Sequence, residues 1–489
     1  MSVLRALFHK KVEFFPSLFF LLMILTIVSV LPNGIAGAEE IVPGVWKGVL
    51  LLREVGQKQS SAQLPSYSMD QQSTPFSFEF YLRILSKERG LLVDIPEQGL
   101  YSYPIDEYTF DAQQISFIFD AIEGDEELRF LGNYSTSFLP PGSTHRGAIV
   151  GSVRGRSWNG SFYVQKQDSS TDPGQISLDI PVEGGALPAT LVFPLRELPF
   201  LDPNSPPDFP LILLVAGAGR ADRDGNNVDV PGKIDSLRQL SNMLRMRNVG
   251  TLRYDKRGTG EAYKLEKPGR MTSFSEHVRD LTSVIIAAAA LPRHGRLIVA
   301  GMNEGAWIAM SALEDEKIAS LVDGFIVIDA SGQSPIETLK QSIASLDEEL
   351  RAKALEAAQN LVQKGVLIDV PVALADFFAP SRKDWLATWL AFDPVETIKQ
   401  VQLPILLIYG ENDLQISREE FSMLVEARPE AAVRIVPEMN YVLKEVKNED
   451  ENYAAFTDPS FKVPSLLADL LASFAKAQPA PEGFVPWRL

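Results

Sequence analysis

Four short polar segments each follow an apolar run, and they contain the residue types that could do chemistry. The first two are residues 216–225 (AGAGRADRDG) and 253–260 (RYDKRGTG). The other two are residues 301–305 (GMNEG) and 410–413 (GEND). In a parallel α/β sheet the ligand site lies at the carboxyl ends of the strands, so residues at such junctions meet at one edge. We therefore expect these four segments to form a common site.

Together the segments resemble those of bacterial α/β-hydrolases of the serine aminopeptidase and carboxylesterase type, particularly exported members with a small β domain before the hydrolase domain. The most specific element is the run Arg253 to Gly258, and residues 439–444 (MNYVLK) add to it. The resemblance covers residues 176–444 well and the N-terminal part loosely. It implies an α/β-hydrolase fold and a serine nucleophile, an acid and a histidine base.

The nucleophile position of this pattern is occupied by Asn303. Gly301 and Gly305 keep the small–x–nucleophile–x–glycine elbow, in which a strained strand-to-helix turn points the nucleophile into the site. An amide nitrogen is delocalised into its carbonyl group and has no ionisable proton near neutral pH. Asn303 therefore cannot form an acyl-enzyme.

The base position is also changed, because Tyr441 stands where the family places its histidine and no histidine follows His294. A phenol titrates near pH ~10 and is a poor base at neutral pH. The acid position is retained as Asp413. With no histidine to orient, we favour a structural role for Asp413, bonded to Tyr441 or to nearby backbone. His277 is a better candidate for a substitute base than His294, which lies at the opposite end of the elbow strand.

The backbone N–H groups of Ala218 and Glu304 match the oxyanion hole of the family. Because these donors belong to the backbone, we expect them to survive the changes in the triad and to remain able to bind a small-molecule acyl or carboxylate ligand. Arg253 and Asp280 match framework positions, and we interpret both as structural. No cofactor or metal is expected: Asp222 replaces the third glycine of a dinucleotide fingerprint, and glycine comes too early in residues 222–225 for a calcium loop.

The segments that must position these residues read as buried strands alternating with helices. The apolar runs are residues 211–216, 249–254, 297–300, 325–328, 405–409 and 433–436, separated by amphipathic segments at 234–247, 274–290 and 306–313. Continuous apolar strands joined by helical crossovers predict a mostly parallel sheet flanked by helices. Residues 335–394 predict a largely helical insertion where a lid could cover the site.

Before this domain the pattern changes. Residues 39–170 contain short apolar runs between turn-rich stretches, which predicts a small, mainly antiparallel β domain. The α/β-hydrolase domain is expected over residues 171–475, with a C-terminal tail at 476–489.

Residues 1–38 follow the pattern of a signal peptide, with a basic start, an apolar run and the small-residue site Ala36–Gly37–Ala38. We expect cleavage there, a periplasmic or extracellular protein and no membrane span after cleavage; the alternative is an uncleaved anchor.

Composition excludes several classes of function. The chain has no cysteine, which excludes disulfides, thiolate zinc sites and thiol nucleophiles. Its net charge of -17 repels phosphate, which argues against a nucleic-acid partner.

Two functions remain. We favour a catalytically dead or strongly impaired hydrolase homologue that acts as a binding or interaction module, since loss of triad members can lower the rate by about a millionfold. The alternative is an active carboxylesterase or peptidase for small acyl esters or peptides, with a relocated nucleophile and base. The pair Asn303 and Tyr441 discriminates between them, because fold alone does not.

Overall fold

The computed structural model describes residues 41–54, 76–98, 100–122, 126–135, 147–166, 174–194, 209–230, 232–291, 294–479 and 485–486. The expected signal peptide and the expected boundary near residue 170 lie outside these residues. Contacts between Cα atoms divide the described chain into two compact units. One holds the residues up to 81 and from 105 to 166; the other holds residues 82–104 and those from 174 onward. The sequence-based domain limits stay a prediction.

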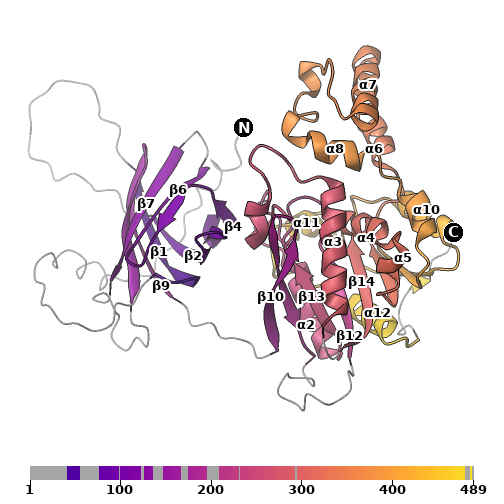
Figure 1. Cartoon of the computed structure of the whole chain (residues 1–489), viewed down its shortest axis with the longest axis horizontal. Coiled ribbons are helices and arrows are strands. Elements are labelled where there is room, and N and C mark those ends of the chain that lie inside the picture. Colours follow the sequence, from indigo (N-terminus) through magenta and orange to yellow (C-terminus); the bar gives the residue numbers. More distant parts are fainter. Residues whose placement is uncertain are drawn as a thin grey trace, which may run out of the picture. The chain divides into compact units, whose positions relative to one another are not determined.

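The N-terminal strands form a nine-stranded sheet in the order β4-β3-β2-β1-β9-β8-β7-β6-β5 (Figure 1). The strands are β1 (Gly44–Glu54), β2 (Phe76–Ser86), β3 (Gly90–Ile95), β4 (Leu100–Ile105), β5 (Tyr108–Phe110), β6 (Gln114–Ile122), β7 (Glu126–Ser135), β8 (Ala148–Arg154) and β9 (Trp158–Lys166), with a 3-10 turn η1 (Pro96–Gln98). Strands β5 to β9 pair antiparallel, as does β1 with β9. Buried aromatic rings pack against one face of this sheet. Among them, Phe117 on β6 stacks on Phe130 on β7 with ring centroids 4.5 Å apart.

The second sheet has the order β10-β11-β13-β12-β14-β15-β16-β17-β18. Its strands are β10 (Gln175–Val182), β11 (Gly185–Val192), β12 (Phe209–Val215), β13 (Gly250–Tyr254), β14 (His294–Met302), β15 (Gly324–Ile328), β16 (Ile405–Gly410), β17 (Ala432–Val436) and β18 (Val485–Pro486). Strands β12 to β17 are parallel, and β11 pairs antiparallel with both β10 and β13. This order, with β12 inserted between β13 and β14, is that of the α/β-hydrolase fold, so the predicted fold class is confirmed.

Helices cover both faces of this sheet. Helices α2 (Ser236–Met246) and α12 (Ser465–Ala475) pack on one face. The other face packs against α3 (Phe274–Ala289), α4 (Glu304–Leu313), α5 (Glu316–Ala319), α9 (Pro394–Gln400) and α10 (Arg418–Ala427). Along β12, Leu211 and Leu213 face one core while Ile212 and Leu214 face the other, which explains why the strand sequence is apolar without alternation. Two shorter elements are η2 (Gly260–Leu265) and α11 (Glu449–Ala454).

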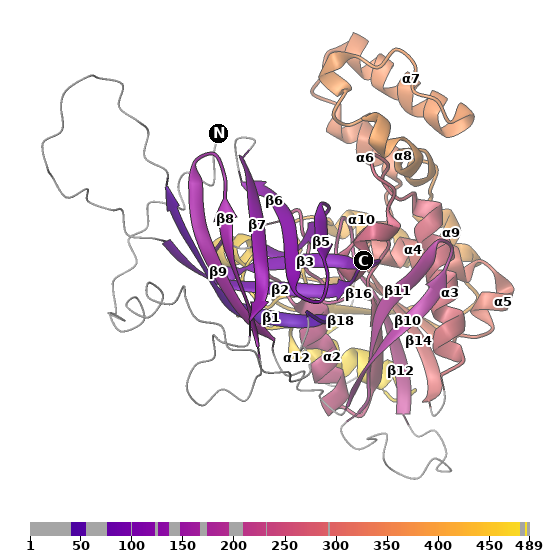
Figure 2. The same ribbon diagram turned by 60° about the vertical axis from the view of Figure 1, so that its left-hand side comes forward.

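A helical insertion lies between β15 and β16 and is drawn in orange at the top of Figures 1 and 2. It contains α6 (Pro335–Ser342), α7 (Glu348–Lys364), η3 (Val372–Leu374), η4 (Pro380–Arg382) and α8 (Lys383–Trp389). It has its own core, which includes Leu361, Phe378 and Leu386. None of the helices in the described part of the chain has the length and apolar character needed to cross a membrane.

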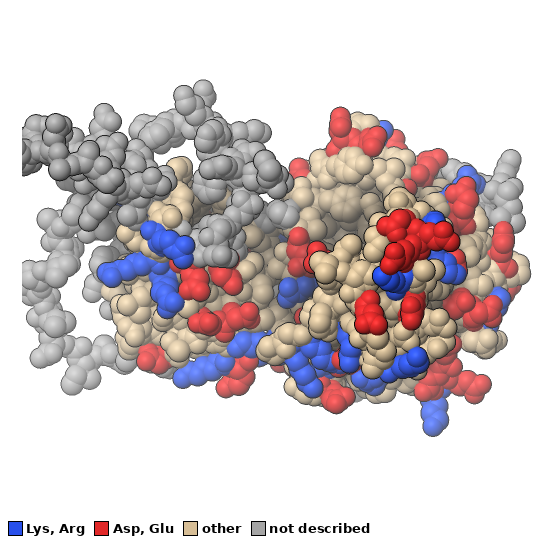
Figure 3. All heavy atoms as spheres, turned by 90° about the horizontal axis from the view of Figure 1, so that it is seen from above, with Lys and Arg blue, Asp and Glu red and all other residues tan. Residues whose placement is uncertain are grey.

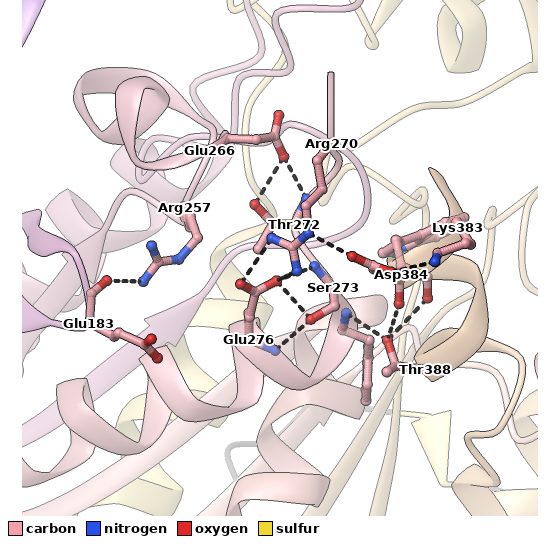
Figure 4. A network of polar contacts seen from close by, with 12 residues as sticks. Glu183, Arg257, Glu266, Arg270, Thr272, Ser273, Glu276, Lys383, Asp384 and Thr388 are labelled. Atoms are coloured by element: carbon pink, nitrogen blue, oxygen red, sulfur yellow. Dashed lines mark hydrogen bonds and ion pairs between the residues drawn. The ribbon is translucent and has the colours of Figure 1, made fainter. Parts of the chain in front are cut away.

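A polar network joins α8 to the beginning of α3 (Figure 4). The Arg270 guanidinium donates to Asp384 at 2.6 Å and to both carboxylate oxygens of Glu276 at 2.8 and 3.1 Å. Glu276 also closes a capping box with Ser273 at the N-terminus of α3. The Thr388 hydroxyl accepts from the first N–H group of α3 at 3.0 Å. The insertion is therefore anchored to the hydrolase domain through α8.

Charged side chains of both signs are interspersed on the face drawn in Figure 3. A nucleic-acid footprint is normally a continuous basic patch. The expected lack of a nucleic-acid partner stays a prediction.

Candidate functional site

The turn between β14 and α4 places Asn303 at φ 48° and ψ −119°. A positive φ is uncommon for a residue other than glycine and marks a strained backbone. The Asn303 N–H group donates to the Ile328 carbonyl at 2.9 Å, and the Ala306 N–H group donates to the Asn303 carbonyl at 3.0 Å. This is the strand-to-helix geometry of a nucleophile elbow.

The two elbow glycines are required by close backbone approach. A Cβ atom on Gly301 would lie 2.4 Å from the Ala306 Cα atom. A Cβ atom on Gly305 would lie 2.5 Å from the Ala216 carbonyl oxygen. Neither obstacle is a flexible side chain, so any larger residue would open the junction of α4 with β12 and β14.

The Asn303 side chain is fixed at one end and free at the other. Its Nδ2 atom donates to the Asp329 carbonyl at 2.9 Å. Its Oδ1 atom has no donor within the described part of the chain, although the residue is only 4% exposed. A Cβ atom on Gly217 would lie 2.6 Å from this oxygen. A buried hydrogen-bond acceptor therefore stands close to the loop after β12.

Asp413 follows β16 and is buried. Its Oδ1 atom accepts from the backbone N–H groups of Gln415 at 2.7 Å and Ile416 at 3.0 Å. Its Oδ2 atom has no hydrogen-bond partner among the described residues. Burial raises the pKa of this carboxyl to about 6. The backbone contacts match one form of the expected structural role, and no hydrogen bond joins Asp413 to Tyr441.

A second carboxylate, which the sequence analysis missed, lies beside it. Asp329 follows β15, the neighbour of β16, at φ 44° and with 0% of its surface exposed. Its Oδ1 atom accepts from the Gly410 N–H group at 2.5 Å, and its Oδ2 atom has no partner in the described structure. Burial and the charge of Asp413 hold the pKa of Asp329 well above its usual range. The signal was present, because Asp329 directly follows an apolar run as the other four segments do.

Tyr441 lies in the turn after β17. The Asn440 Oδ1 atom accepts from the N–H groups of Val442 at 3.2 Å and Lys444 at 2.9 Å, which holds this turn. Burial, followed by the charges of Asp413, Glu304 and Asp329, raises the pKa of the Tyr441 phenol. The phenol therefore stays protonated at neutral pH, as expected for a poor base.

A cavity of about 410 Å³, which we call the elbow cavity, opens at this end of the sheet. The residues that line it are Ala218, Gly219, Met271, His277, Asn303, Glu304, Trp307, Ser331, Thr338, Arg382, Trp385, Trp389, Gln415, Ile416, Glu420 and Tyr441. It thus brings together two of the three triad positions, both residues of the expected oxyanion hole and side chains of the helical insertion. Asp413 does not line it, although the two residues that donate to its carboxylate do.

The Glu304 carboxylate bonds to the backbone of Gly219, the residue that follows Ala218 of the expected oxyanion hole. Burial raises its pKa, while Lys256, the Trp385 side chain and the Gly219 backbone favour its charged form. The Lys256 ammonium donates to the Gly217 carbonyl at 2.5 Å and the Gly219 carbonyl at 3.1 Å. The loop after β12 is therefore held between the Lys256 ammonium group and the Glu304 carboxylate.

The two histidines considered as substitute bases are placed differently. His277 lines the elbow cavity, whereas His294 begins β14 at the opposite end of the sheet. Burial, together with the charges of Lys256 and Arg257, lowers the pKa of His277 to about 3. The imidazole is neutral at pH 7, but so low a pKa makes it a weak proton acceptor.

The framework residues make structural contacts. Arg257 forms a two-pronged ion pair with Asp280, at 2.8 and 2.9 Å, which joins the loop after β13 to α3. Arg253 pairs with Asp224. Within the described residues, no group of three or more His, Cys, Asp or Glu side chains is arranged to hold a metal ion.

No family model matches this chain. Esterase EstD of Thermotoga maritima is 23% identical over 268 residues, which are 54% of this chain and 59% of that protein, so the match spans about three fifths of the relative. Est1E from Butyrivibrio proteoclasticus is 14% identical at a TM-score of 0.36, covering 57% of this chain and 96% of that one. A proline iminopeptidase from Mycobacterium smegmatis is 13% identical at a TM-score of 0.38, covering 62% and 98%.

Proposed function

We propose that this protein is a non-catalytic, exported binding module built on the α/β-hydrolase fold. The proposal depends on one observation: Asn303 occupies the strained elbow, and both elbow glycines are retained. The turn keeps the form that presents a nucleophile, but an amide occupies it. Because an amide nitrogen has no nucleophilic lone pair at neutral pH, the family's acyl-enzyme route is closed.

The base position supports the same conclusion. Burial and three acidic neighbours raise the pKa of the Tyr441 phenol and keep it protonated, so it cannot accept the proton that an attacking water or hydroxyl group must lose. Export is supported by the leader-like pattern of residues 1–38.

The alternative is an active esterase with a relocated nucleophile. The sequence match to a protein named an esterase supports this alternative. Ser331 and Thr338 carry hydroxyl groups at the elbow cavity, which His277 also lines. The Ser331 hydroxyl donates to Glu420 at 3.4 Å, and the Thr338 hydroxyl donates to the Ser334 carbonyl at 3.3 Å. Neither hydroxyl is hydrogen-bonded to His277, and the contact of Ser331 with the Glu420 carboxylate is long, so we favour the binding module.

A serine-directed fluorophosphonate probe tests this proposal. The purified, folded protein should remain unlabelled and should not turn over p-nitrophenyl acetate above the rate of heat-denatured protein. An active serine hydrolase in the same assay is the positive control. Stoichiometric labelling of Ser331, or ester turnover with a burst phase, would replace the binding module with the relocated-nucleophile enzyme.

A further inference from the structure

Aromatic rings form one wall of the elbow cavity. The Trp385 and Trp389 rings of α8 stack with centroids 4.9 Å apart at 21°, and the Trp307 ring of α4 lies 6.4 Å from Trp389. The tether of α8 to α3 holds two of these indoles in place. A wall of this kind binds flat apolar groups, and the faces of its rings attract cations.

A hydrogen-bond acceptor without a donor in the described structure lies at the cavity. It is the Asn303 Oδ1 atom, whose residue is more than nine-tenths buried and lines the cavity. Asp329 and Asp413 do not line the cavity, but their charges act on Tyr441, which does, and each has an oxygen without a partner in the described structure. Buried acceptors of this kind are normally satisfied, so they indicate a partner that brings donors.

The charges at the cavity favour a cation. The Glu304 and Glu420 carboxylates line it. Of the basic side chains nearby, Lys256 is engaged with two backbone carbonyls and does not line the cavity, and Arg382 is exposed to solvent. His277 is neutral because its pKa is lowered to about 3. The charge of Lys256 also acts on Glu304, so the two carboxylates that line the cavity stand against one buried ammonium group outside it and one screened arginine.

Glu304 also disfavours an anionic ligand. Its carboxylate already bonds to the Gly219 backbone and the Trp385 indole, so it is an anion fixed at the cavity. A second anion placed there would be repelled by the first.

We propose that the elbow cavity binds a compact amine, with its ammonium group at the Asn303 and Glu304 end and a flat apolar body against the three indoles. The ammonium group supplies the missing donors and pairs with the carboxylates. This inference rests on the proposed function and names its ligand class. It departs from the acyl or carboxylate ligand expected from the sequence.

Three probes of nearly equal size test the inference: 2-phenylethylamine, 2-phenylethanol and phenylacetate. Binding to the whole protein is followed by tryptophan fluorescence and by calorimetry. We expect the amine to bind at least ~10-fold more tightly than the alcohol, because a partly desolvated cation gains from both the carboxylates and the aromatic faces. Phenylacetate should bind more weakly than either.

Two matched charge variants locate the effect. Glu304→Gln should remove most of the preference for the amine over the alcohol. Asp376→Asn, which removes an exposed carboxylate of the insertion, should leave that preference unchanged. Trp389→Leu should weaken amine and alcohol alike, and the melting temperature of each variant shows whether it is folded.

Three results would overturn the inference: equal binding of amine and alcohol, tightest binding of phenylacetate, or binding of none of the probes. Ester turnover is measured separately on the same samples. Turnover would contradict the proposed function without bearing on the amine preference, so the two failures are distinguishable.

Discussion

Asp329 and Asp413 follow adjacent parallel strands, and each keeps one carboxylate oxygen without a hydrogen-bond partner in the described structure. Both residues are buried, and the charge of Asp413 raises the pKa of Asp329. Two neighbouring buried carboxyl groups that lack a cation destabilise the folded state when they ionise, and a well-packed core does not need them. We interpret the pair as part of a site, because functional sites commonly sacrifice stability.

Asp329 and Asp413 should make the free energy of unfolding decrease as pH rises. The pKa of Asp413 is raised to about 6, so between the ordinary aspartate pKa and about 6 the folded state binds more protons than the unfolded state. The free energy of unfolding therefore decreases through this window. Asp329, whose pKa is raised further, extends the decrease to higher pH. We expect a higher melting temperature at pH ~5 than at pH ~8 from these two groups.

Asp329→Asn should raise the melting temperature at pH ~8 by roughly 2–4 °C and change it little at pH ~5. The amide removes the buried charge and gives Asp413 a potential donor, while its oxygen still accepts from Gly410. Asp376→Asn, at an exposed position, is the control and should have no effect. An equal shift at both pH values would show that the gain does not come from ionisation.

Gly305→Ala should lower the free energy of unfolding by about 2–4 kcal/mol. The added methyl group would lie 2.5 Å from the carbonyl oxygen of Ala216, directly after β12, and the rigid elbow cannot move away without disturbing α4. Gly269→Ala is the matched control: its φ is +70°, but a Cβ atom there meets nothing within 4 Å, so only the backbone conformation opposes it, by about 1 kcal/mol. Equal losses measured by thermal unfolding would argue against a close-packed elbow.

Much of this site was predictable from sequence, because strand ends and glycines leave local signals. Asn303, Glu304 and Tyr441 were found by their place after apolar runs or in a family-like segment, and all three line one cavity. The aromatic wall was not predictable. Trp385 and Trp389 lie more than 80 residues after the elbow, and their approach to Trp307 depends on tertiary contacts such as that of Arg270 with Asp384. Asp329 could have been predicted, because it directly follows an apolar run as the four chosen segments do.

Asp384→Asn should loosen α8. It removes the charge that pairs with Arg270, and because both side chains are partly exposed the loss should be modest, about 0.5–1 kcal/mol. Hydrogen exchange of the α8 amides should become ~2–5-fold faster if α8 opens as a local unit. Glu349→Gln removes the exposed partner of Lys353 on α7 and should leave α8 unchanged. Identical exchange of α8 in both variants would mean that other contacts hold the insertion.

The mature chain should begin at Glu39. The small-residue site Ala36–Gly37–Ala38 directly precedes two acidic residues, as expected for signal-peptidase cleavage. Intact-mass measurement of the exported protein checks this start. A mass that retains residues 1–38 would favour a membrane anchor in place of cleavage.

Restoring the triad should require both missing members. Asn303→Ser alone and Tyr441→His alone should stay nearly inactive on p-nitrophenyl acetate, because a serine without a base is a weak nucleophile and an imidazole without a serine has nothing to activate. The double variant should show measurable hydrolysis. The unpartnered Asp413 Oδ2 atom can then accept a hydrogen bond from the new imidazole, and the backbone donors of Ala218 and Glu304 can receive the oxyanion, at roughly 3–4 kcal/mol per donor.

The structure adds a third change to this repair, because the Glu304 carboxylate bonds to the backbone of Gly219, the residue after the expected oxyanion donor Ala218. Adding Glu304→Gln to the double variant should raise the rate again, by ~10-fold or more, since it removes the repulsion of an oxyanion. Adding Asp413→Asn instead should lower the rate by disturbing the tautomer and orientation of the imidazole. If the folded double variant shows no gain over either single change, then Asn303 and Tyr441 do not stand in for a serine and a histidine. If the triple variant is no faster than the double one, Glu304 does not block the oxyanion hole, and the preference of the elbow cavity for amines must come from its other acceptors.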